Sequence, residues 1–159
     1  MKTAGECLVI GLGNPERGDD GVGPLVAERL LGKAHSIIHT GDAFGLIEDW
    51  AGADFVFVVD AAALFSAPGC VHRIDALQEA LPRALLAPST HTFGLIDAIQ
   101  LARALDVLPR RLVIFAIEGA CFELGAGISP EVSAAADRAV RLIMEELRIL
   151  DDAGDPIDA

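Results

Sequence analysis

Short runs of apolar residues alternate along the chain with longer segments in which apolar residues recur at helical spacing. Strands are expected at residues 7–10, 36–40, 54–60, 70–74 and 111–117, and helices at 21–31, 44–51, 92–105 and 130–150. This alternation predicts an α/β fold: a three-layer α/β/α sandwich with a mostly parallel, five-stranded twisted sheet and helices on both faces. The weak strand at 70–74 is expected to run antiparallel at an edge.

The ends of the elements carry recognisable signals. Asp19 and Asp20 stand where caps of the first long helix are expected, and Ser129 and Pro130 fit the first positions of the last helix. Residues 1–150 are predicted to form a single domain. The acidic segment DDAGDPIDA, residues 151–159, is expected to be a disordered tail.

Charge narrows the range of partners. With 24 acidic and 12 basic residues, the net charge is −12, which disfavours binding to nucleic acids and to anionic membranes. Three widely spaced cysteines form no CxxC pair and indicate a reducing compartment. The short apolar N-terminal run does not resemble a signal peptide, and no apolar run has membrane-spanning length. We therefore expect a soluble, cytoplasmic protein.

Polar residues cluster where predicted strands end, the edge at which ligands bind in parallel sheets. Asp20 lies in a glycine-rich loop after the first strand, Asp60 ends the apolar run FVFVV, and His91 lies in the loop before a helix. If the fold brings them together, two carboxylates and an imidazole form a ligand set suited to a divalent transition metal.

Each of these residues also has a structural interpretation. Asp19 or Asp20 could simply cap a helix, although two adjacent acids cannot serve as the same cap. An isolated His91 is more typical of a surface or capping position, whereas Asp60 is harder to bury without a partner. Glu118 is interpreted as a second acid beside the site or as a solvated residue. His35, His39 and His72 are interpreted as incidental.

The glycine-rich turn allows further alternatives. GxGxxG is absent, so a dinucleotide site is poorly supported, and neither GxSxG nor HExxH occurs. GLGNP also opens the bacterial peptidyl-tRNA hydrolases, but the chain has no histidine before His35. A hydrolase of that type and a non-catalytic nucleotide or metallochaperone module remain as alternative hypotheses.

An ordered set of motifs resembles the hydrogenase maturation proteases from residue 7 to about residue 149. GLGN at 11–14 and DDGVG at 19–23 resemble the family's opening motif, G-x-G-N, four residues, then D-D/E-G-x-G. The resemblance continues through GDAFGL at 41–46, VVDA at 58–61 and STHTFGL at 89–95. It ends with Ile117-Glu118 and GISPEV at 127–132, and Gly119 stands where the family commonly has proline.

The resemblance implies an endopeptidase that removes the C-terminal extension of a nickel-iron hydrogenase large-subunit precursor after nickel insertion. The precursor is then the partner, and the family's metal-binding and catalytic positions fall on Asp20, Asp60 and His91. The divalent metal is expected to be the precursor's own nickel rather than a permanently bound ion. Asn14, Thr40 and Asp42 are expected to bind substrate, and Thr40 stands where some members carry an acid.

Overall fold

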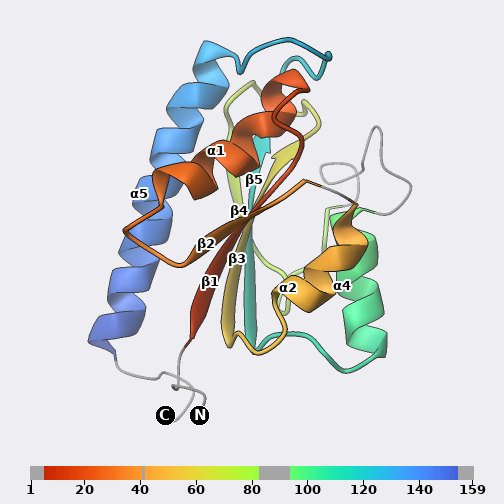
Figure 1. Ribbon diagram of the computed structural model, residues 1–159, viewed down its shortest axis with the longest axis vertical. Helices are drawn as coiled ribbons and strands as arrows, with labels where there is room; N and C mark the ends of the chain where they lie inside the picture. Colours follow the sequence, from red (N-terminus) through yellow and green to blue (C-terminus); the bar gives the residue numbers. More distant parts are fainter. Residues whose placement is uncertain (1–5, 41, 83–93, 154–159) are drawn as a thin grey trace.

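The computed structural model describes residues 6–40, 42–82 and 94–153, in which five strands form one sheet (Figure 1). The strands are β1 (Cys7–Leu12), β2 (Ser36–His39), β3 (Phe55–Ala62), β4 (Val71–Asp75) and β5 (Arg111–Glu118). Their order is β2-β1-β3-β5-β4, with only β4 antiparallel to its neighbour. The predicted α/β class and the antiparallel edge strand are confirmed.

Helices pack on both faces of this sheet, as Figure 1 shows. Helices α1 (Val22–Arg29) and α5 (Pro130–Asp152) share one apolar core with the sheet. The 3-10 turn η2 (Ala43–Gly45) and helices α2 (Leu46–Asp49) and α4 (Leu95–Ala104) share the other. Among the described helices, none has the length and apolar character needed to cross a membrane.

The central strands are apolar because both of their faces are covered. β3 and β5 pair along their whole length, from Phe55 opposite Arg111 to Ala62 opposite Glu118. Successive side chains of a strand point to opposite faces. Val58 accordingly packs in the core beneath α2 and α4, whereas Val59 packs in the core beneath α1 and α5.

Several element boundaries differ from the sequence prediction. α5 continues through Asp152, so its helix takes in the first two residues of the predicted tail, and residues 154–159 lie outside the described segments. α4 begins at Leu95, while the predicted helix began at Thr92, which also lies outside them. Asp19 and Asp20 make no side-chain caps, because the chain forms the 3-10 helix η1 (Gly18–Gly21) before α1.

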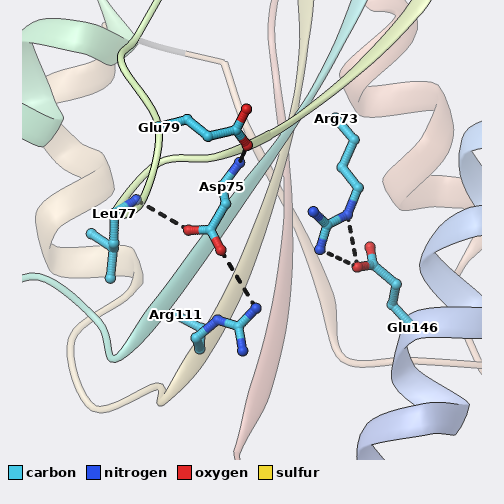
Figure 2. A network of polar contacts seen from close by, with 6 residues as sticks. All are labelled: Arg73, Asp75, Leu77, Glu79, Arg111 and Glu146. Carbon is cyan, nitrogen blue, oxygen red and sulfur yellow. Dashed lines mark hydrogen bonds and ion pairs between the residues drawn. The ribbon is translucent and has the colours of Figure 1, made fainter.

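A polar network holds β4 to its surroundings at the end of the sheet where β5 begins (Figure 2). Arg73 reaches Glu146 of α5 from its Nε at 2.8 Å and also from Nη2. Asp75 lies 3.5 Å from Arg111, the first residue of β5. These ion pairs are partly exposed, and exposed pairs contribute little to stability. The network links the edge strand β4 to α5 and to the start of β5, at the end of the sheet opposite to the predicted site.

Candidate active site

Two glycines allow α1 to approach the sheet closely, behind the loop that carries Asp19 and Asp20. A Cβ on Gly23 would lie 2.3 Å from the Leu12 carbonyl oxygen and 2.5 Å from that of Val59. A Cβ on Gly11 would lie 2.1 Å from the Gly23 carbonyl oxygen. The space that these glycines leave is filled by the protein's own backbone. They therefore serve close packing of a helix on a sheet, and a dinucleotide cradle gains no support.

Asp19 is a buried structural carboxylate. Its oxygens accept hydrogen bonds from the backbone N–H groups of Ala120 at 2.8 Å, Cys121 at 3.1 Å and Ser129 at 2.7 Å, and from the Ser129 hydroxyl at 3.0 Å. Burial alone would raise its pKa, but these donors outweigh it and the pKa of Asp19 is lowered. Asp19 thus fastens the loop after β5 to the loop after β1. It also engages the Ser129 hydroxyl, which the sequence had suggested as a helix cap.

Asp20 and Asp60 are the two predicted metal-binding carboxylates of the candidate site. Asp20 is half-buried in η1, and one of its oxygens accepts the backbone N–H of Asn14 at 3.0 Å. Asp60 lies near the end of β3 and is also half-buried. Burial, followed by the charge of Asp20, raises the pKa of Asp60 well above its ordinary value. Two carboxylates that repel each other at a partly desolvated sheet edge suit a cation, because its charge would relieve that repulsion.

His91 is the third predicted ligand, and it lies outside the described residues. The structure thus brings together two of the three predicted metal-binding residues and says nothing of the third. Asp20 comes from the loop after β1 and Asp60 from β3, which pair in parallel and end at the same sheet edge. The predicted metal site requires its two carboxylates to lie at the same edge of the sheet in this way.

The residues predicted to bind substrate lie in two loops at the same edge. Asn14 closes a local turn, accepting the backbone N–H of Glu16 on its Oδ1 at 2.9 Å. Thr40 and Asp42 are exposed beyond β2, where the Asp42 side chain accepts the Phe44 N–H at 3.0 Å. The side chains of Asn14 and Asp42 therefore each shape their own loop and leave part of their surface open to solvent.

His39, which sequence reasoning treated as incidental, organises the loop after β2. Its Nδ1 lies 2.7 Å from an Asp49 carboxylate oxygen, and its Nε2 lies 2.6 Å from the carbonyl oxygen of Asp42. A Cβ on Gly45 would lie 2.7 Å from the imidazole, so only glycine leaves room for the ring there. His39 thereby sets the position of Asp42.

The interpretation of Glu118 as a solvated residue and that of His72 as incidental are both wrong. Glu118 is completely buried and not solvated, and its Oε1 accepts backbone N–H groups of Phe65 and Ser66, each at 2.5 Å. Its Oε2 lies 2.6 Å from His72 Nε2. Burial opposes ionisation, but the hydrogen bonds from His72 and from the backbone lower the pKa of Glu118 to about 2. An acid that directly follows the buried run RLVIFAI was the available signal in the sequence.

With this geometry established, comparison with known proteins decides the family. A family model described as hydrogenase maturation protease matches residues 25–146, more than half of the chain. The chain belongs to the hydrogenase maturation protease family. The peptidyl-tRNA hydrolase alternative is consequently not favoured.

Individual family members agree with this assignment. The hydrogenase expression/formation protein HupD of Thiocapsa roseopersicina is 26% identical, covering 92% of this chain and 70% of that protein. The NiFe hydrogenase maturation protease HybD from Thermococcus kodakarensis superposes with a TM-score of 0.71 at 25% identity, covering 89% of this chain and 98% of its own. The E. coli maturating endopeptidase HybD shares the fold, with a TM-score of 0.72 at 23% identity and 94% coverage of both chains.

Proposed function

We propose that this protein is a cytoplasmic endopeptidase that removes the C-terminal extension of a nickel-iron hydrogenase large-subunit precursor after nickel insertion. Membership of the maturation protease family supports the reaction class. The observation that carries the proposal is the presence of two half-buried carboxylates, Asp20 and Asp60, at one edge of the sheet, where burial and the charge of Asp20 raise the pKa of Asp60. Such a pair suits recognition of a cation at the place where a parallel sheet binds its ligands.

Asp20, Asp60 and His91 are proposed to hold the nickel of the precursor, which makes the metal part of the substrate. A divalent ion polarises a carbonyl and lowers the pKa of bound water, so it can assist peptide hydrolysis without a serine or cysteine nucleophile. Burial and the charge of Asp20 disfavour the ionised form of Asp60, and a bound cation would supply the counter-charge that both effects leave wanting. The same requirement makes cleavage depend on prior nickel loading.

The loops around the carboxylates offer surfaces for the precursor chain. Asn14, Thr40 and Asp42 supply polar groups, and Phe44, Phe65 and Leu124 supply exposed apolar ones, at 59%, 77% and 70% exposure. The three apolar residues are here called the apolar rim. Phe44 lies in η2, which follows β2, and Phe65 and Leu124 lie in the loops that follow β3 and β5. We assign the rim to contacts with the precursor, since exposed apolar side chains gathered near a site are typical of protein-binding surfaces.

The decisive experiment follows processing of purified precursor, with and without nickel, as a mobility shift on a gel. Asp20→Asn and Asp60→Asn are expected to slow cleavage of the nickel-loaded precursor by about 100-fold or more, because each removes a charged ligand. Glu28→Gln, an exposed acid of α1, is the matched control and should cleave normally. Rapid cleavage by folded Asp60→Asn would contradict the proposed site, and equal cleavage of nickel-free precursor would contradict recognition of nickel.

A further inference from the structure

A second group of potential metal ligands lies at the β4 side of the sheet, apart from Asp20 and Asp60. Cys70, His72 and Glu118 each offer one ligand atom, and these atoms lie within 4.8 Å of one another. Cys70 directly precedes β4, His72 lies on β4 and Glu118 ends β5. Neither the proposed cleavage reaction nor nickel recognition uses any of them.

Backbone hydrogen bonds hold the three residues in place. The Glu118 N–H donates to the Cys70 carbonyl at 3.0 Å, and the Glu118 carbonyl accepts the Gly69 N–H at 2.7 Å. The Oε1 of Glu118 is occupied by two backbone donors, so its orientation is set. Oε2 is left facing His72 Nε2 at 2.6 Å, and the Cys70 thiol donates to the same carboxylate. The potential ligands therefore converge before any ion arrives, which lowers the cost of ordering them.

The register of the sheet places His72 of this cluster two strands away from Asp60. His72 pairs with Ala116 of β5, and Ala116 pairs with Asp60 of β3. Two strand spacings, about 10 Å, therefore lie between the backbones of His72 and Asp60. Among the described residues, the ligand atoms that converge at β4 are those of Cys70, His72 and Glu118, and the group includes neither Asp20 nor Asp60.

We propose that Cys70 Sγ, His72 Nε2 and Glu118 Oε2 bind a late first-row divalent metal ion such as Zn²⁺. A mixed sulfur, nitrogen and oxygen set is typical of such ions, and hard ions such as Mg²⁺ prefer oxygen alone. Three protein ligands leave a fourth tetrahedral position for water. Only coordination bonds form, so no oxidant or reductant is needed.

Protons must leave as the metal binds. Burial, together with Glu118, raises the pKa of the Cys70 thiol, so the metal-free thiol keeps its proton and releases it to solvent on coordination. The proton that His72 Nε2 donates to Glu118 in the metal-free protein must also leave that nitrogen, and solvent takes it up or returns it to Nδ1. The imidazole then binds through Nε2 in its neutral form, with its proton on Nδ1. Arg138, whose Nη2 donates to the Gly69 carbonyl at 2.6 Å, favours the thiolate that results.

The cluster is open to an incoming ion on one side. The His72 side chain keeps 29% of its surface exposed and Cys70 is half-buried, whereas Glu118 forms the closed floor. A bound metal would join the segment before β4, β4 itself and the end of β5. Because Glu118 also accepts the backbone N–H of Phe65, a bound metal would stiffen the loop that carries this residue of the apolar rim.

Titration of the intact protein with Co²⁺ tests the proposal, because a thiolate ligand produces a charge-transfer absorption band that carboxylates and imidazoles do not. We expect the band to saturate at one equivalent and to disappear when Zn²⁺ is added. Cys70→Ser should abolish it. His72→Gln should abolish or greatly weaken it, while the glutamine amide can still donate to Glu118 and preserve the fold.

Matched controls separate this site from the rest of the protein. Cys121→Ser and Asp60→Asn should retain the band, and Asp60→Asn should retain it even though cleavage is lost. Absence of the band in the unaltered protein would overturn the proposal. So would its persistence in folded His72→Gln or its loss in Cys121→Ser. Circular dichroism of each metal-free variant establishes folding, and His72→Gln decides the matter if Cys70→Ser does not fold.

Discussion

Adjacent acids, Asp19 and Asp20, differ more in their surroundings than any sequence rule suggests. Asp19 is fully buried among four donor groups from the loop after β5 and from the residue that precedes α5. Asp20 is half-buried, and its charge contributes to the raised pKa of Asp60. The first acid is held as a charged structural link, while the second is the predicted metal ligand. Two adjacent acids thus have different surroundings and are assigned different roles.

Replacing Asp19 with asparagine should destabilise the protein without directly altering the proposed ligands. The amide loses the charge that strengthens these hydrogen bonds, and its NH₂ group faces donors, so we expect a loss of about 2–3 kcal/mol in urea unfolding at neutral pH. Asp137→Asn, which breaks only an exposed ion pair with Arg29, should cost less than about 1 kcal/mol.

The same variant predicts a pH dependence of stability. The pKa of Asp19 is lowered in the folded protein from its ordinary value of 3.8, so folding favours the carboxylate. The stabilisation is fully present above that value and is lost as pH falls through the folded-state pKa. The difference in unfolding free energy between wild type and Asp19→Asn should therefore shrink below about pH 4. A difference that grows on acidification would contradict this role.

At the scale of elements, the glycines of the opening motif set how closely α1 approaches the sheet. Gly23 lies against the carbonyl oxygens of both β1 and β3. That contact places η1, and therefore Asp20, beside the carboxyl end of β3. The motif residues consequently act through packing as well as through chemistry.

Gly23→Ala should reduce stability strongly, since a new methyl group would overlap two backbone carbonyls that cannot rotate away. Overpacking of this kind is expected to cost about 3 kcal/mol or more. Gly127→Ala is the control, because a Cβ there meets nothing within 4 Å. Denaturant midpoints of the two variants provide the measurement. If their stabilities agree within about 0.5 kcal/mol, the close approach of α1 is wrong.

At the scale of the whole molecule, the parallel topology gathers distant segments at one edge. Loops after β1, β2, β3 and β5 all emerge beside the carboxylates, although they are spread over most of the sequence. The ion-pair network of Figure 2 lies at the opposite end of the sheet, where β5 begins. The proposed site and the ion-pair network thus lie at opposite ends of the sheet.

The apolar rim should matter for binding of the precursor. Leu124→Ala and Phe65→Ala are expected to raise KM for nickel-loaded precursor by about tenfold, with a smaller change in kcat, because exposed contacts act mainly in binding. Leu105→Ala is the matched control, since Leu105 is 58% exposed and follows α4, away from the site edge. Equal KM values for Leu124→Ala and Leu105→Ala would remove Leu124 from the docking surface.

The sequence by itself determined the architecture and the family. Continuous apolar runs such as FVFVV can be satisfied only by strands covered on both faces, and helical spacing identifies the covering helices. The ordered motifs indicated the maturation proteases, and a family model confirms that assignment. The placement of Asp20 and Asp60 at one edge of the sheet was predictable because strand ends of a parallel sheet converge, and their role as metal ligands stays a prediction.

Only the tertiary structure decided the partners of the remaining polar residues. The burial of Asp19 depends on donors about a hundred positions away, and the pairing of His72 with Glu118 depends on the register of an antiparallel edge strand. Local patterns constrain which face a side chain occupies, but not which distant group meets it there. Long-range contacts of this kind form only when the chain folds, and they distinguish residues that look alike in the sequence.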